Sequence, residues 1–152
     1  MLKQLIRLIN DLKLDMSEYG DFDVVASYFR VFDDSKNEYK KIDIPEDDET
    51  FEKSEKIDSP IYEIYKDKDD PEICLITKYL PEDEGSHEKP LNFYSFYNQL
   101  IEFPKKYKKY EVVTSAWMHL DDQYTGRRDI PVRAVLVDEE LKRICMVEVA
   151  SD

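Results

Sequence analysis

Short apolar runs, separated by clusters of acidic and turn-forming residues, are the feature that most constrains the fold of this 152-residue chain. The runs are rich in aromatic and β-branched side chains, which favour strands over helices. Runs of this length with Asp, Asn, Ser or Pro clusters between them are typical of hairpins. The segments expected to be strands cover residues 22–32, 39–44, 61–66, 73–79, 111–120, 131–137 and 142–149.

Two segments follow a helical period instead. Residues 2–16 place leucine, isoleucine and methionine at spacings of three and four with charged residues opposite, which predicts an amphipathic N-terminal helix. Residues 91–103 repeat this spacing, and Pro104 ends the second predicted helix. The polar stretch 45–59 fits a short surface helix or a loop equally well, because its acids precede its lysines. Residues 122–129 are expected to form a loop around Gly126.

These elements predict one α+β domain over residues 1–152 with a mainly antiparallel sheet built from hairpins. Most connections between the expected strands are too short for a parallel crossover. The exception is the connection through the helix at about 91–103, which is long enough to join two parallel strands.

Composition excludes several classes of protein. A formal net charge of −13 and a pI of about 4.6 argue against direct nucleic-acid binding, which needs a cationic surface. Only 3 glycines are present and none are clustered, so a phosphate-binding nucleotide loop is not expected. Cys74 and Cys145 lie in apolar runs, which predicts two buried free thiols and a reducing, cytoplasmic setting. No run has the roughly 18 apolar residues of a membrane span.

The acidic excess is located in one part of the chain. Residues 33–89 hold 20 Asp and Glu against 9 Lys and Arg, a net charge of −11, and the remaining residues carry a net −2. This stretch predicts either a solubilising surface or an acidic face that docks a partner with a basic surface. The residues expected to bind such a partner are Glu46, Asp47, Asp48, Glu49, Asp67, Asp69, Asp70, Glu82, Asp83 and Glu84.

The segment around His119 is the best candidate for catalysis. His119 could act as a general base with Asp121 or Asp122 orienting its imidazole, because residues two apart on a strand share a face. Arg127 and Arg128 in the predicted loop could hold an anionic group. The five residues together suggest the pocket of a small hydrolase or phosphodiesterase.

Metal ligands are present but poorly arranged. The acidic turn at 67–72 lacks the central glycine and distal glutamate of a calcium loop. The residues Cys74, His87, His119 and Cys145 show no paired zinc-ligand spacing. We therefore expect neither a metal nor another cofactor.

The leading functional hypothesis is a non-enzymatic domain that docks a basic protein, in the manner of an inhibitor, an immunity protein or a nucleic-acid mimic. One alternative is the hydrolase built on His119. Another is a scaffold-type domain whose partner uses a sheet edge.

Overall fold

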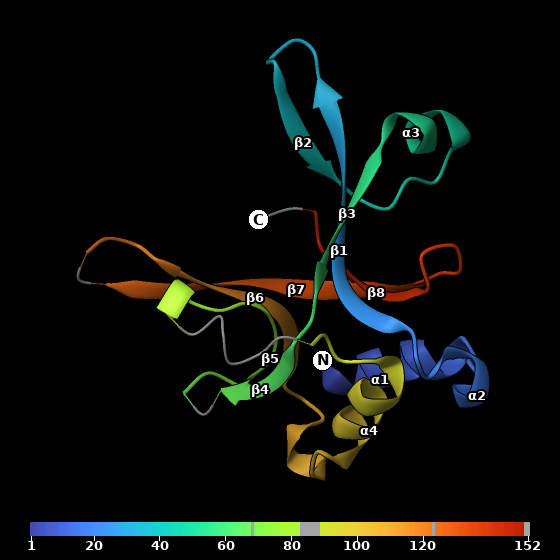
Figure 1. The fold of residues 1–152 in the computed structure, drawn as a ribbon, viewed down its shortest axis with the longest axis vertical. Coiled ribbons are helices and arrows are strands. Elements are labelled where there is room, and N and C mark those ends of the chain that lie inside the picture. The colour runs from blue at the N-terminus through green and yellow to red at the C-terminus, as the bar shows by residue number, and fades with distance from the viewer. Residues whose placement is uncertain (68, 83–88, 123, 151–152) are drawn as a thin grey trace.

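The computed structural model describes residues 1–67, 69–82, 89–122 and 124–150 (Figure 1). It is an α+β fold with one mixed, mostly antiparallel sheet, as predicted. The strands lie in the order β2-β1-β8-β7-β6-β5-β4, and β3 pairs with the other side of β1. The elements are α1 (Leu2–Asp11), α2 (Met16–Tyr19), β1 (Asp23–Asp33), β2 (Glu38–Ile42), α3 (Asp48–Lys53), β3 (Glu55–Pro60), β4 (Glu63–Asp67), β5 (Glu72–Lys78), α4 (Phe93–Glu102), η2 (Lys105–Tyr107), β6 (Glu111–His119), β7 (Thr125–Asp138) and β8 (Arg143–Glu148).

Hairpins supply most of the strand pairs. β1–β2, β4–β5, β6–β7 and β7–β8 are antiparallel neighbours in sequence. β5 and β6 are parallel and are connected through α4, which confirms the one parallel crossover expected from the sequence. A second parallel pair joins β1 to β8, the first strand to the last. That pair is not a local connection, so hairpin patterns could not predict it.

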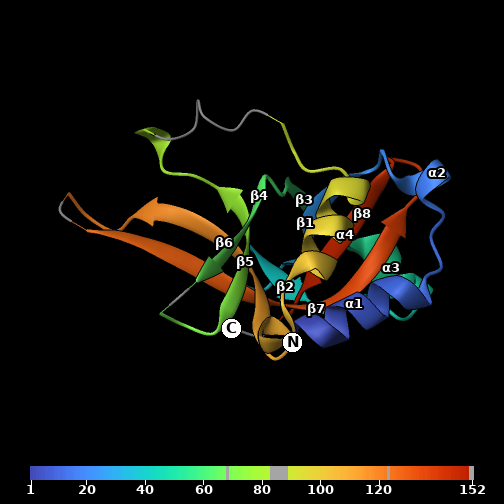
Figure 2. The ribbon, with the colours of Figure 1, turned by 90° about the horizontal axis from the view of Figure 1, so that it is seen from below.

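The helices α1 and α4 cover one face at one end of the sheet (Figure 2). Their apolar stripes pack against the inward side chains of the strands and form the main core. Figure 2 also shows the β6–β7 hairpin extending beyond the helices. The core residues include Leu2, Leu5, Ile9, Val24, Ala26, Ile73, Leu75, Phe93, Phe96, Leu100, Val112, Val135, Ile144 and Met146.

The N-terminal helix is shorter than the predicted span of residues 2–16. α1 ends at Asp11, and Lys13 adopts a left-handed backbone conformation with φ of 51°, which no α-helix tolerates. The Asp15 carboxylate then accepts a hydrogen bond from the Ser17 amide and begins the separate helix α2. The apolar residues keep their helical spacing across this break, so the spacing does not reveal where α1 ends.

The sequence pattern missed the strand β3 and predicted too short a strand in the place of β7. The stretch 45–59 contains the short helix α3, one of the two predicted possibilities, but also the unpredicted strand β3. β7 begins at Thr125, inside the loop predicted for 122–129. Both segments are polar and lack a strand-like alternation of apolar residues. They are strands because β1 and β6 pair with their backbones.

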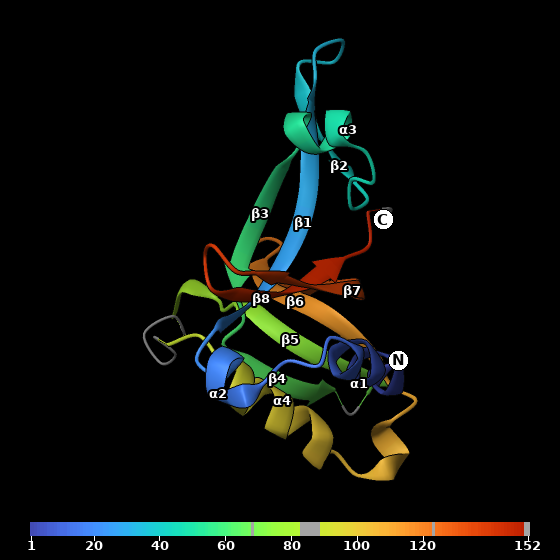
Figure 3. The ribbon, with the colours of Figure 1, turned by 90° about the vertical axis from the view of Figure 1, so that its right-hand side faces the viewer.

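β1, β2, β3 and α3 form an arm that extends away from the rest of the sheet (Figure 3). This arm holds the first half of the acidic stretch 33–89, and the second half includes β4 and β5. Among the described residues, no helix is both long and apolar enough to cross a membrane.

Candidate functional site

The sheet divides where β8 ends. β8 lies between Asp23–Ser27 of β1 and Val132–Asp138 of β7, and its last residue is Glu148. Beyond that point β1 continues in the arm, paired with β2 and β3, whereas β7 continues toward Thr125, paired only with β6. The two branches diverge widely (Figure 1). The space between them is a cleft of about 320 Å³, which we call the fork cleft.

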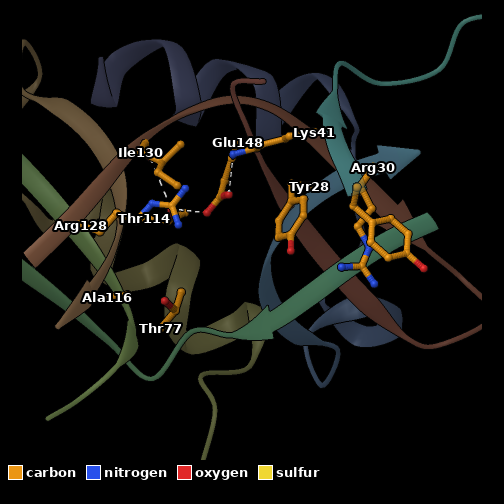
Figure 4. Close-up of a pocket in the computed structure, with 10 residues that line it drawn as sticks. Tyr28, Arg30, Lys41, Thr77, Thr114, Ala116, Arg128, Ile130 and Glu148 are labelled. Atoms are coloured by element: carbon orange, nitrogen blue, oxygen red, sulfur yellow. Dashed lines mark hydrogen bonds and ion pairs between the residues drawn. The ribbon is translucent and has the colours of Figure 1, made fainter. Parts of the chain in front are cut away.

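The fork cleft lies on the same sheet face as the main core. Val24 and Ala26 of β1 pack in that core, and Tyr28 and Arg30 follow them on the same face because side chains alternate along a strand. On β8, Met146 is in the core and Glu148 is the next residue on that face. The cleft is therefore the polar continuation of a face whose other end is covered by the helices. Its lining consists of Tyr28, Arg30, Tyr39, Lys41, Thr77, Thr114, Ala116, Arg128, Ile130 and Glu148 (Figure 4).

Glu148 organises the base of the fork cleft. Its side chain is only 10% exposed, and one carboxylate oxygen accepts a hydrogen bond from the Lys41 ammonium at 3.1 Å. The other oxygen accepts a short hydrogen bond from the Thr114 hydroxyl. Figure 4 shows this chain of contacts running from β2 through β8 to β6. A buried carboxylate is stable only when it is paired in this way.

On the arm side of the cleft, two cations lie over tyrosine rings. The Arg30 guanidinium lies 3.9 Å from the centre of the Tyr39 ring and forms an ion pair of 2.9 Å with Glu55. The Lys41 ammonium lies 5.2 Å from the centre of the Tyr28 ring. Contacts between cations and rings hold both cations in place against the arm.

Arg128 faces these groups from β7. It is exposed, and its guanidinium has no ion-pair partner among the described residues. The cleft lining thus carries the three cations Arg30, Lys41 and Arg128 and the single carboxylate Glu148. Three cations and one carboxylate give the lining a formal charge of +2, and the ion pair of Arg30 with Glu55 reduces it to +1, on a chain with net charge −13. Such a concave surface is suited to holding an anionic group through Arg128.

The residues of the predicted hydrolase pocket have different neighbours in the structure. His119 is at the end of β6, where its Nε2 atom lies 3.1 Å from a carboxylate oxygen of Glu82 and its side chain is 46% exposed. The Asp121 carboxylate accepts a hydrogen bond from the Tyr124 amide and so supports the β6–β7 turn. Asp122 is exposed in the same turn. These contacts connect His119 to Glu82 and Asp121 to the β6–β7 turn, and neither is a contact with Arg127 or Arg128.

Arg127 and Arg128 project to opposite faces of β7, as neighbours on a strand must. Arg127 is largely buried and pairs with Asp67 at 2.6 Å and with Asp129 at 2.8 Å. Its hydrogen bond lowers the pKa of the Asp67 carboxyl. Arg127 is therefore a structural residue, and only Arg128 reaches the fork cleft.

The acidic residues of the predicted docking face are found in three separate places. Glu46, Asp47, Asp48 and Glu49 lie at the start of α3, where the Asp47 carboxylate caps the helix by accepting a hydrogen bond from the Thr50 amide. Asp67, Asp69 and Asp70 form the β4–β5 turn at the other end of the molecule (Figure 1). Glu82 pairs with His119, and Asp83 and Glu84 lie outside the described residues.

The residues considered as metal ligands are also separated. Cys74 and Cys145 are buried free thiols, as predicted, and lie in two different apolar clusters. Burial raises the pKa of Cys74 to about 11, which disfavours its thiolate. His87 lies outside the described residues. Within the described part of the chain, ligand atoms of Asp67, Asp70 and Glu72 lie within 4.8 Å of one another, but Arg127 already neutralises Asp67.

Sequence reasoning missed most of the fork cleft. A usable signal was present, because Tyr28 with Arg30 and Tyr39 with Lys41 each share one face of a predicted strand. No sequence signal indicated that Thr114 and Arg128 would face them from across the sheet.

Comparisons with known proteins leave the function to be argued from this geometry. No protein-family model, curated protein or solved structure matches the chain.

Proposed function

We propose that this chain is a binding domain whose fork cleft takes an anionic group of a partner molecule. The observation that carries the proposal is the cluster of Arg30, Lys41 and Arg128 around a concave surface of a strongly acidic protein. A cleft in which cations outnumber carboxylates also attracts ligands of negative charge.

The three cations have different roles in this proposal. Arg30 and Lys41 are held by Glu55, Glu148 and the tyrosine rings, so little side-chain entropy is lost when a ligand binds. Arg128 has no ion pair among the described residues, so its guanidinium is available for a bidentate contact with a carboxylate or phosphate. Thr77 also lines this surface, but its hydroxyl donates to the Ser115 carbonyl at 3.1 Å.

A titration with inorganic tripolyphosphate, followed by amide chemical shifts in two-dimensional NMR, tests the proposal. We expect shifts centred on Thr77, Thr114, Arg128 and Glu148. Loss of one charged hydrogen-bonding group weakens binding by roughly 1.5–3 kcal/mol, so Arg128→Ala should lower the affinity about 10- to 100-fold.

Arg133→Ala is the matched control. Arg133 also lies on β7 and is exposed, but it pairs with Asp43 outside the fork cleft. The affinity of this variant should stay within about threefold of the wild type, because exposed ion pairs contribute little. Shifts spread over all lysines and arginines, with equal losses in both variants, would mean non-specific attraction and would refute the proposal.

A basic partner is the second candidate, and one feature of the arm supports it. The residues Asp43, Glu46 and Asp47 line a hollow of about 650 Å³ beside α3. A basic protein could dock there through electrostatic attraction that weakens with salt. Titration with hexalysine should shift amides of residues 43–47, and Glu46→Gln should weaken binding more than the control Glu140→Gln on the β7–β8 turn. Equal effects of the two substitutions would remove this candidate.

A further inference from the structure

The first half of β7 has a free hydrogen-bonding edge along the fork cleft. The Val149 amide donates to the Pro131 carbonyl at 3.0 Å, so the carbonyl of Pro131 points toward β8 and away from β6. Residues two apart in an antiparallel strand direct their backbone groups the same way. Asp129 and Arg127 therefore point their amides and carbonyls away from β6, toward the place where β8 would lie if it continued.

The pairing of β7 with β6 agrees with this orientation. The Leu120 amide donates to the Tyr124 carbonyl at 2.9 Å. Along an antiparallel pair of strands, every second pair of opposite residues is joined by backbone hydrogen bonds. Counting from Leu120–Tyr124, the joined pairs include Ala116–Arg128 and Thr114–Ile130. Within the described chain, no strand pairs with the other edge of Thr125–Ile130.

The free edge borders the same cleft that Arg30, Lys41 and Arg128 line. A strand added beside β7 would place every second side chain on the face of Arg128, toward Arg30 and Lys41. The side chains between them would point to the opposite face. Residues on the same face of a strand are roughly 6.5–7 Å apart, so successive acidic residues could meet different cations of the cleft.

We propose that the ligand of the fork cleft is an acidic peptide segment that binds in extended conformation by adding a strand to β7. It would run antiparallel to β7, in line with the end of β8, and present alternate carboxylates to Arg30, Lys41 and Arg128. Backbone hydrogen bonds to Arg127 and Asp129 would supply affinity, and the cations would select the acidic side chains. This inference rests on the proposed anion-binding function and specifies its partner.

The pairing rules identify which peptide amides make contact. Peptide residues opposite Arg128 face the cleft and direct their amides away from β7, whereas those opposite Arg127 and Asp129 direct their amides toward β7. In an alternating Glu-Thr peptide bound with its glutamates in the cleft, the threonine amides are the ones that pair. This difference allows a control that leaves the charge unchanged.

The experiment uses three fluorescein-labelled heptapeptides of sequence Glu-Thr-Glu-Thr-Glu-Thr-Glu and measures fluorescence anisotropy. One peptide is unmodified, one is N-methylated at its threonines, and one is N-methylated at its internal glutamates. Loss of the two hydrogen bonds to Arg127 and Asp129, at about 1 kcal/mol each, predicts a loss of at least about 30-fold for the threonine-methylated peptide. The glutamate-methylated peptide should bind within about threefold of the unmodified one.

Hydrogen exchange provides a second measurement. The unmodified peptide should slow exchange of the Arg127 and Asp129 amides, and leave that of the Arg128 amide unchanged because it already pairs with β6. Arg128→Ala, checked for folding by circular dichroism, should weaken the peptide and tripolyphosphate alike.

The outcomes separate the two proposals. If tripolyphosphate binds but the three peptides bind equally or not at all, strand addition is wrong and anion binding stands. If neither probe binds the cleft, both proposals fail. Tighter binding of a labelled heptathymidylate than of the peptide would instead assign the cleft to a nucleic-acid strand, and a dimer of the free protein in sedimentation with slowed exchange at Arg127 would assign the edge to a second copy.

Discussion

Asp58 on β3 is the centre of a polar network that joins the arm to the rest of the sheet. Its carboxylate accepts hydrogen bonds from the Ser27 hydroxyl at 2.6 Å, the Lys56 ammonium at 2.9 Å and the Arg143 guanidinium at 2.9 Å. These partners come from β1, β3 and β8, and the Asp58 side chain is only 7% exposed. The substitution Asp58→Ala should therefore destabilise the fold and loosen the branch of the fork cleft that carries Arg30.

The magnitude follows from what each partner loses. Ser27 is fully buried, and an unsatisfied buried hydroxyl costs about 1–3 kcal/mol. Lys56 keeps a second carboxylate, that of Asp138 at 3.0 Å, and Arg143 is exposed enough to turn to water. Each of these two contributes about 0–1 kcal/mol. Together these terms lower the free energy of unfolding by about 1–5 kcal/mol.

Urea unfolding followed by circular dichroism measures this difference at neutral pH. The control is Asp43→Ala, which removes an exposed carboxylate from its ion pair with Arg133 and should cost no more than about 1 kcal/mol. A loss of less than 1 kcal/mol for Asp58→Ala, or a loss equal to that of the control, would refute the network as a support for the arm.

The pH dependence of stability provides an independent test of the same network. Burial acts to raise the pKa of Asp58, but hydrogen bonds from Ser27, Lys56 and Arg143 outweigh it and hold the pKa below the ordinary value. The folded state then binds fewer protons than the unfolded state, so the stabilisation is complete above the ordinary Asp pKa of about 3.9 and is lost as pH falls through the lowered value. The Asp58→Asn variant should lose less stability than the wild type between about pH 5 and pH 2. Parallel curves would contradict the assignment.

Three further tests concern the core packing, the backbone after α1 and the ion pair of Arg127. Phe96→Ala empties a fully buried core position and should cost about 3–5 kcal/mol in urea unfolding, whereas Phe51→Ala, at 62% exposure, should cost below about 0.5 kcal/mol. Lys13→Gly relieves the left-handed backbone after α1 and should raise the midpoint of thermal unfolding, with a gain of about 0.5–1 kcal/mol. Arg127→Ala leaves Asp67 without its partner and should cost about 2–4 kcal/mol, and Arg127→Lys should restore part of it; equal stability of the two variants would contradict the ion pair's role.

Local patterns predicted the elements that bury an apolar face. The runs that became β1, β5, β6 and β8 alternate or are continuously apolar, and α4 begins where Asn92 caps it and ends before Pro104. Burial of their side chains drives these segments, so their identity is visible in the order of residue types. The same reasoning found both free cysteines, because each lies in an apolar run.

Sequence patterns failed for segments that are strands because a neighbouring strand pairs with their backbone, and not because they bury an apolar face. β3 has the sequence Glu-Lys-Ile-Asp-Ser-Pro, and each of its charged residues has an ion-pair partner on another strand. The first half of β7 contains Gly126, Arg127 and Arg128, and extends because β6 is beside it. Tertiary hydrogen bonds override the local preference of such polar segments for turns.

The amino-acid order by itself determined the α+β class, the hairpins, the two main helices and the concentration of acid in residues 33–89. The tertiary structure alone decided the position and the partners of the charged side chains. It distributed the acids over separate elements, sent Arg127 into buried ion pairs and placed Arg128 opposite Arg30 and Lys41. The physical reason is the parallel pairing of β1 with β8, a contact between the two ends of the chain, which sets where the sheet divides and therefore which distant side chains share the fork cleft.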